Sequence, residues 1–170
     1  NNSARLFGLH QTYELWFKLL THEIQAMMAL LSKGQLSQSI WIMKRCNHIA
    51  GILHQQILVM ETMSPTSFLE FRNLLNPASG LQSYQFRCLE FMSGLKQERY
   101  LALYEPNSIG HTALSKALVE PTIWDIFMTY LKSVGFRVDQ PSDQLASLKV
   151  IYTDPQWDSL HFFCECLMDY

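Results

Sequence analysis

Apolar side chains recur at steps of three and four residues along almost the whole chain, and this spacing limits the fold more than any other feature. Residues three or four apart lie on one face of an α-helix. The first such stripe ends just before Gly34 and contains Leu9, Tyr13, Trp16, Leu20, Ile24, Met27 and Leu31. The second contains Ile42, Cys46, Ile49, Leu53, Ile57 and Met60. Two long helices joined by a short turn at Gly34 are therefore predicted to pack antiparallel.

Cap and breaker residues predict shorter helices further along the chain. Ser64 and Pro65 favour a helix start, and that helix is expected to end near Leu75, before a proline- and glycine-containing break. Further helical segments are expected at residues 81–93, 97–103, 108–119, 121–134, 143–152 and 155–170. The predicted fold class is all-α: a helical bundle in which two long antiparallel helices are followed by shorter C-terminal helices. Residues 1–170 are expected to form a single domain.

Composition argues against several classes of protein. Apolar residues make up 48% of the chain and charged residues 16%, and this sparse charge suggests oligomer contacts or missing partner segments. The net charge is -2 with Lys and Arg dispersed, which argues against nucleic-acid binding. No apolar run reaches the roughly 18 residues that a membrane helix needs. The 4 cysteines are expected to be free thiols in a reducing environment, so a cytoplasmic protein is predicted.

The histidines do not predict a metal centre within the chain. A helical metal site needs ligands three, four or seven residues apart, so that they face one point. His48 and His54 are six residues apart, and they point to different sides of a helix. His10 and Glu14 have a suitable step, but two ligands do not make a site. All the histidines except His10 are therefore interpreted as surface or hydrogen-bonded core residues.

His10 stands out because its neighbours are apolar and aromatic. Phe7 and Leu9 precede it, and Tyr13 and Trp16 follow it. A buried imidazole without a partner costs about 1–3 kcal/mol, so a ligand N–H is one candidate partner. A surface position or an ordinary hydrogen bond within the core is the alternative.

Arg72 raises a similar question because it shares a helical face with Phe68 and Leu75. Its planar guanidinium can grip a ligand carboxylate with two parallel hydrogen bonds. The alternative is an ion pair with an acid of the chain itself, such as Glu61 or Glu70. Beyond this segment, Gly80 would let the backbone approach a flat or bulky group closely, and Ser79 could donate a hydrogen bond.

Three stretches of the sequence resemble the tryptophan 2,3-dioxygenase family. The first runs from His10 to Lys18 and continues with His22 and Glu23. The second runs from Met60 to Pro65 and on through residues 68–75, and the third covers residues 77–87. These strings are long and contain many uncommon residues, so they indicate family membership strongly.

The resemblance implies an all-helical homotetramer that binds haem b. Such an enzyme inserts both atoms of O2 across the indole C2–C3 bond of L-tryptophan and gives N-formylkynurenine, in tryptophan catabolism by the kynurenine pathway. His10 matches the distal histidine that binds the indole N–H, and Arg72 matches the arginine that grips the substrate carboxylate. The other matched positions are the pocket walls Leu6, Phe7, Gly8, Leu9, Phe68 and Leu75, and the haem-edge residues Ser79 and Gly80.

The sequence also departs from the family pattern. The axial histidine of the iron is expected beyond Tyr170, and the family phenylalanine four residues before the distal histidine is here Leu6, with Phe7 one position later. We therefore expect a piece of a longer chain that is inactive by itself. Two alternatives stay open: a diverged relative that oxidises a modified tryptophan, and a non-catalytic helical binding module that lacks the haem half.

Overall fold

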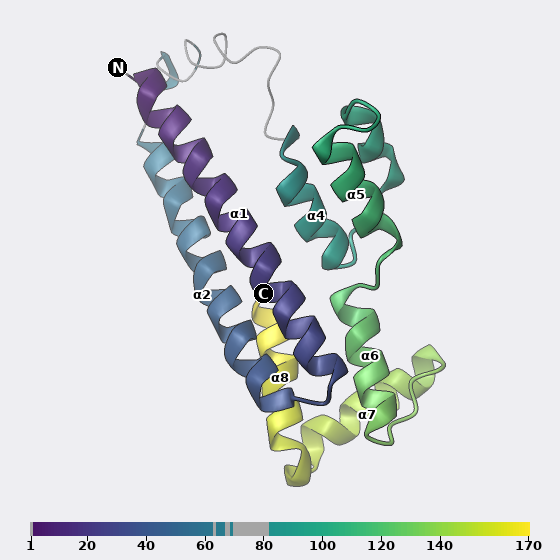
Figure 1. The fold of residues 1–170 in the computed structure, drawn as a ribbon. Coiled ribbons are helices and arrows are strands. Elements are labelled where there is room, and N and C mark those ends of the chain that lie inside the picture. The colour runs from purple at the N-terminus through teal and green to yellow at the C-terminus, as the bar shows by residue number, and fades with distance from the viewer. Residues whose placement is uncertain (1, 63, 67–68, 70–81) are drawn as a thin grey trace. The chain divides into compact units, whose positions relative to one another are not determined.

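All regular structure in the described part of the chain is helical. The computed structural model describes residues 2–62, 64–66, 69 and 82–170, with side chains from Gly8 onward. No strand occurs within these ranges (Figure 1). This confirms the all-α fold class, which the helical spacing of apolar residues predicted.

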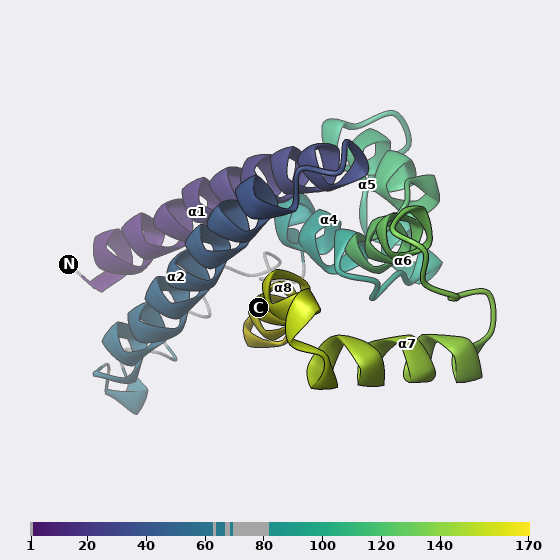
Figure 2. The ribbon, with the colours of Figure 1, turned by 90° about the horizontal axis from the view of Figure 1, so that it is seen from below.

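Two long helices begin the chain, as predicted. Helix α1 spans Asn2–Ser32 and helix α2 spans Leu36–Glu61. Gly34 lies in the turn between them with φ of 77°, in the left-handed region that glycine adopts without steric penalty. The turn is closed by a hydrogen bond from the Gly34 N–H to the Leu31 carbonyl, at 2.9 Å. Views from two directions show α2 running back beside α1 (Figures 1 and 2).

The described residues form two compact units, and each contains part of both long helices. The first unit comprises Asn1–Thr21 and Ile49–Glu120, and the second comprises His22–His48 and Pro121–Tyr170. Each unit is treated separately below. The expectation of a single domain stays a prediction.

The first unit adds α4 (Tyr84–Met92), the 3-10 helix η2 (Glu98–Leu103) and α5 (Ile109–Val119) to its portions of α1 and α2. The Ser83 and Ser108 hydroxyls cap α4 and α5, and this supports the predicted helices in both places. Residues 98–103 form a 3-10 helix, whereas the sequence predicted only a short helical piece. The core between α4 and α5 consists of Cys88, Phe91, Leu114 and Ala117.

The second unit contains α6 (Ile123–Ser133), α7 (Pro141–Thr153), the 3-10 helix η3 (Pro155–Trp157) and α8 (Asp158–Asp169). Its portions of α1 and α2 are joined by an ion pair between Arg45 and Glu23 at 2.7 Å. The Phe127 and Phe163 rings, from α6 and α8, lie 5.6 Å apart between centroids. The fully buried apolar residues of this unit include Ile24, Met27, Leu31, Met43, Leu131, Ile151 and Leu160.

Three further predictions concern the cysteines, the helix that starts at Ser64 and membrane spans. Cys46, Cys88, Cys164 and Cys166 are all free, as expected, and all four are buried. The helix predicted from Ser64 to Leu75 falls largely outside the described residues. No helix of the described part is both long enough and apolar enough to cross a membrane.

Candidate functional site

A small pocket lies within the first unit, where α1, α2 and the start of α4 meet. Its volume is about 250 Å³, a little below the roughly 300 Å³ at which typical small-molecule pockets begin. Most of its surface is apolar. The lining residues are Leu9, His10, Tyr13, Glu14, Phe17, Met60, Ser83 and Phe86.

One face of α1 supplies most of the pocket. Four lining residues of α1 are separated by steps of three, one and three residues, so a regular helix brings them onto one side. They are His10, Tyr13, Glu14 and Phe17. Leu9 lies at the edge of the same face. The helical spacing that defines the fold therefore also gathers these side chains in one place.

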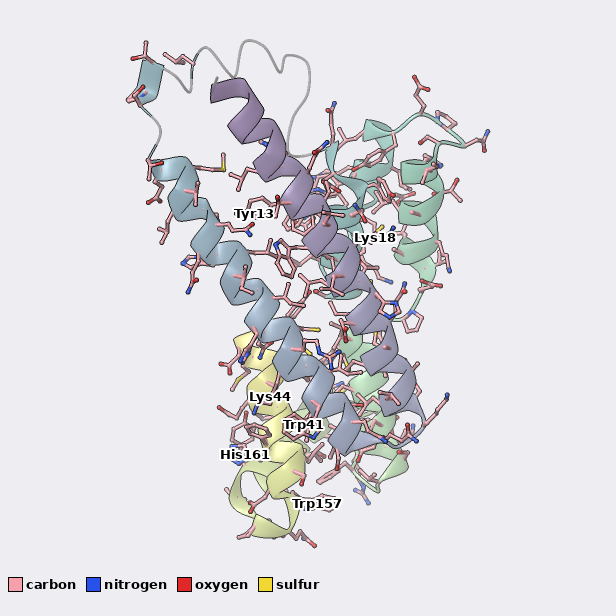
Figure 3. The ribbon with its side chains drawn as sticks, turned by 60° about the vertical axis from the view of Figure 1, so that its left-hand side comes forward. Tyr13, Lys18, Trp41, Lys44, Trp157 and His161 are labelled. Carbon is pink, nitrogen blue, oxygen red and sulfur yellow. The ribbon has the colours of Figure 1, made fainter. Side chains whose placement is uncertain are left out.

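Tyr13 ties this face to α2. Its hydroxyl donates a hydrogen bond to the Leu53 carbonyl at 2.8 Å. Figure 3 shows Tyr13 pointing from α1 towards α2. Burial raises the pKa of the Tyr13 phenol above its ordinary value, because a phenolate would lose its hydration. The phenol therefore stays protonated and remains a donor at neutral pH.

Gln85 and Phe86 tie the start of α4 to the same face of α1. The Gln85 side-chain amide donates to the Glu14 carboxylate at 2.7 Å and to the Glu14 backbone carbonyl at 3.1 Å. The Phe17 and Phe86 rings lie 5.2 Å apart between centroids, a favourable distance for an aromatic pair. Both contacts lie beside the pocket.

His10 is the only histidine that lines the pocket, and its side chain is exposed among the described residues. This exposure agrees with the surface position that the sequence left open for His10, and its role in binding a ligand N–H stays a prediction. A neutral imidazole offers one donor and one acceptor nitrogen. An apolar pocket with an imidazole at its wall suits a flat apolar ligand that carries an N–H group.

A family profile described as tryptophan 2,3-dioxygenase matches residues 4–123, which include every residue that lines this pocket. The chain belongs to the tryptophan 2,3-dioxygenase family. This confirms the resemblance inferred from the three sequence stretches.

Named relatives support the assignment to the tryptophan 2,3-dioxygenase family. A tryptophan 2,3-dioxygenase from Nocardioides sp. is 43% identical over 86% of this chain and 57% of its own length. Another from Serratia proteamaculans is 35% identical over 94% of this chain and 62% of its own length. A third, from Anaeromyxobacter sp., is 41% identical over 76% of this chain and 49% of its own length. The chain thus spans between about half and three fifths of these relatives.

The site residues predicted from the sequence fall into three groups. His10 and Leu9 line the pocket. Gly8 is exposed on α1, and Leu6 and Phe7 are helical there with side chains outside the described residues. Five further residues lie entirely outside the described residues: Phe68, Arg72, Leu75, Ser79 and Gly80. The convergence of Arg72 and His10 on one cavity therefore stays a prediction.

Several lining residues were missed by the sequence analysis. Tyr13, Glu14 and Phe17 share the helical face of His10, so the step of three or four residues was a sufficient signal for them. Met60, Ser83 and Phe86 lie within or beside the stretches that resemble the tryptophan 2,3-dioxygenase family, but no residue pattern placed them next to His10. Their proximity depends on how α2 and α4 pack against α1.

Membership of the tryptophan 2,3-dioxygenase family implies haem, and the described residues do not fit it by themselves. The pocket offers a single imidazole, and its volume of about 250 Å³ is small for a porphyrin. Within the described ranges no group of three or more His, Cys, Asp or Glu side chains could hold a metal ion.

Proposed function

We propose that the protein to which this chain belongs is a haem b-dependent dioxygenase. It inserts both atoms of O2 across the indole C2–C3 bond of L-tryptophan and gives N-formylkynurenine. One observation carries the proposal: in a member of the tryptophan 2,3-dioxygenase family, His10 and apolar side chains of α1, α2 and α4 face a single pocket. A homotetrameric assembly remains an expectation from the resemblance.

The role proposed for these residues is to bind and orient the substrate. Phe17, Met60 and Phe86 offer an apolar surface that takes the indole ring out of water. The imidazole of His10 accepts a hydrogen bond from the indole N–H and so fixes the rotation of the ring. Holding a reactant in one orientation lowers the entropic part of the activation barrier. Haem, when bound, supplies the oxygen chemistry.

Arg72 is proposed to bind the substrate carboxylate. Replacing it by lysine removes the planar fork and keeps the charge, so we expect Arg72→Lys to raise KM for L-tryptophan by about tenfold or more. Tryptamine lacks the carboxylate, and its KM should change much less. An equal effect on both compounds would favour the alternative, in which Arg72 pairs with Glu61 or Glu70.

The function itself is tested by product analysis with the full-length protein. L-tryptophan and ¹⁸O₂ are supplied, and N-formylkynurenine carrying two labelled oxygen atoms is the expected product. A product formed from a modified tryptophan, with none from L-tryptophan, would favour a diverged relative. No product from either substrate, in protein that contains haem, would contradict dioxygenase activity and favour the binding module.

A further inference from the structure

Gln85 links α4 to the pocket face of α1 by two hydrogen bonds, and both acceptors belong to the same residue, Glu14. Its amide nitrogen donates to the Glu14 carboxylate at 2.7 Å and to the Glu14 carbonyl at 3.1 Å. The first bond fixes the Glu14 side chain, and the second fixes the backbone of α1 at that position. Both side chains are partly buried. A charge-assisted hydrogen bond that is partly shielded from water is stronger than an exposed one.

These two residues connect the α1 wall of the pocket to its α4 wall. Glu14 lies one helical turn after His10 on the same face of α1. Gln85 lies between Ser83 and Phe86, the two residues by which α4 lines the pocket. Fixing residue 14 against residue 85 therefore fixes the His10 face against the α4 wall. The Tyr13 hydroxyl, on the same face of α1, donates to the Leu53 carbonyl of α2 at 2.8 Å and so links this face to α2 as well.

We propose that Gln85 is a positioning residue for the substrate pocket and acts through Glu14. It sets the distance and rotation of the α1 face that carries His10 relative to Ser83 and Phe86. The identity of the ligand in this inference rests on the proposed function. Gln85 does not line the pocket, so its effect on the ligand is indirect.

The inference is tested in the full-length protein with Gln85→Ala. Loss of both hydrogen bonds should raise KM for L-tryptophan about tenfold, with a smaller change in kcat, because α1 is then free to move against α4. The matched control is Gln144→Ala, since the Gln144 amide also donates to a backbone carbonyl, that of Val138, at 3.0 Å, and Gln144 does not line the pocket. The control should leave KM unchanged.

A charge variant adds a pH readout that simple loss of stability would not give. Gln85→Glu places a second carboxylate beside Glu14, and like charges at this distance raise the pKa of the pair. The two groups repel above that pKa, and below it one is protonated and donates to the other. KM for this variant should therefore be raised at alkaline pH and fall towards the wild-type value as the pH is lowered. Adding Glu14→Gln, which restores an amide–carboxylate pair, should recover much of the loss at high pH.

Amide hydrogen exchange separates this inference from the proposed function. Faster exchange confined to α1 near residues 10–17 in Gln85→Ala, and not in Gln144→Ala, is expected whatever the ligand is. If wild-type protein gives no response to L-tryptophan, the proposed function fails and exchange alone decides the role of Gln85. Unchanged exchange in Gln85→Ala would overturn the inference. So would faster exchange with an unchanged KM, provided that the protein turns over L-tryptophan.

Discussion

Gly110 shows how a single residue sets the spacing of helices beside the pocket. It is buried at the start of α5, and a Cβ atom built on it would lie 2.8 Å from Cδ1 of Tyr104 and 3.2 Å from Cβ of Tyr84. Tyr84 is the first residue of α4 and follows Ser83, a residue of the pocket wall. The absence of a side chain at position 110 therefore lets α5 pack closely against the start of α4.

Gly110→Ala should destabilise the protein, because the Tyr104 ring and Cβ of Tyr84 would both have to move. Overpacking of this kind reduces the free energy of unfolding by about 1–3 kcal/mol. The check is urea unfolding followed by circular dichroism. Gly51→Ala is the control: Gly51 lies inside α2, no atom lies within 4 Å of an added Cβ, and alanine there should stabilise by about 0.5–1 kcal/mol. Equal stabilities of the two variants would contradict the role of Gly110.

Residue types alone identified part of the site. His10 was noticed because an imidazole beside Leu9 and Tyr13 is unusual, and both His10 and Leu9 line the pocket. Gln85 could not be found in this way, since a glutamine near a helix start is common and its partner Glu14 lies 71 residues away. Contacts between distant segments depend on helix packing, which the local pattern does not specify.

At the scale of elements, helix ends follow local chemistry, and several were predicted to within two residues. Ser108 caps α5 at the predicted start, whereas α7 begins at Pro141, two residues before the predicted start at Asp143, because a proline without an N–H is tolerated in the first turn. The start of α6 is set by Thr122, which accepts from the Asp125 N–H at 3.1 Å while the Asp125 carboxylate accepts from the Thr122 N–H at 2.8 Å. This reciprocal pair is a capping box, and α6 therefore begins at Ile123, two residues after the start predicted from the sequence at Pro121.

Thr122→Ala should lower the free energy of unfolding by about 1 kcal/mol, because the Asp125 N–H loses its side-chain acceptor. Thr129→Ala on the same helix is the control. Thr129 is exposed, and its hydroxyl only donates to the Asp125 carbonyl one turn back, so its loss should have little effect. Thermal unfolding of both variants measures the difference. A Thr122→Ala protein as stable as Thr129→Ala would show that the capping box contributes nothing.

At the scale of the whole molecule, buried thiols distinguish the folded chain from the unfolded one. Burial raises the pKa of Cys46 to about 12 and those of Cys88 and Cys164 to about 11, because a thiolate loses its hydration inside the protein. The folded state thus holds these protons more tightly than the unfolded state. Their contribution to stability is complete below the ordinary thiol pKa of about 8.5 and is lost as the pH rises through the raised values.

We therefore expect the urea midpoint to fall as the pH is raised from about 8 to about 11. Partly buried tyrosines with raised pKa values, such as Tyr130, act in the same direction, so a variant is needed to isolate the thiol. In Cys46→Ala the urea midpoint should fall by a smaller fraction over that pH range than in the wild type, although the variant is less stable at neutral pH. A fall identical to that of the wild type would exclude Cys46 as a contributor.

We propose above all that His10 binds the indole N–H of tryptophan. The chain spans between about half and three fifths of the length of its relatives, so the test uses the full-length protein. The most direct test is the ratio of kcat/KM for L-tryptophan to that for 1-methyl-L-tryptophan, which has no indole N–H. His10→Ala should lower this ratio by about three- to tenfold, which corresponds to the free energy of one hydrogen bond. The control is His54→Ala, which should leave the ratio unchanged because His54 is exposed on α2 and does not line the pocket. A ratio that is the same in wild-type and His10→Ala protein would contradict the account.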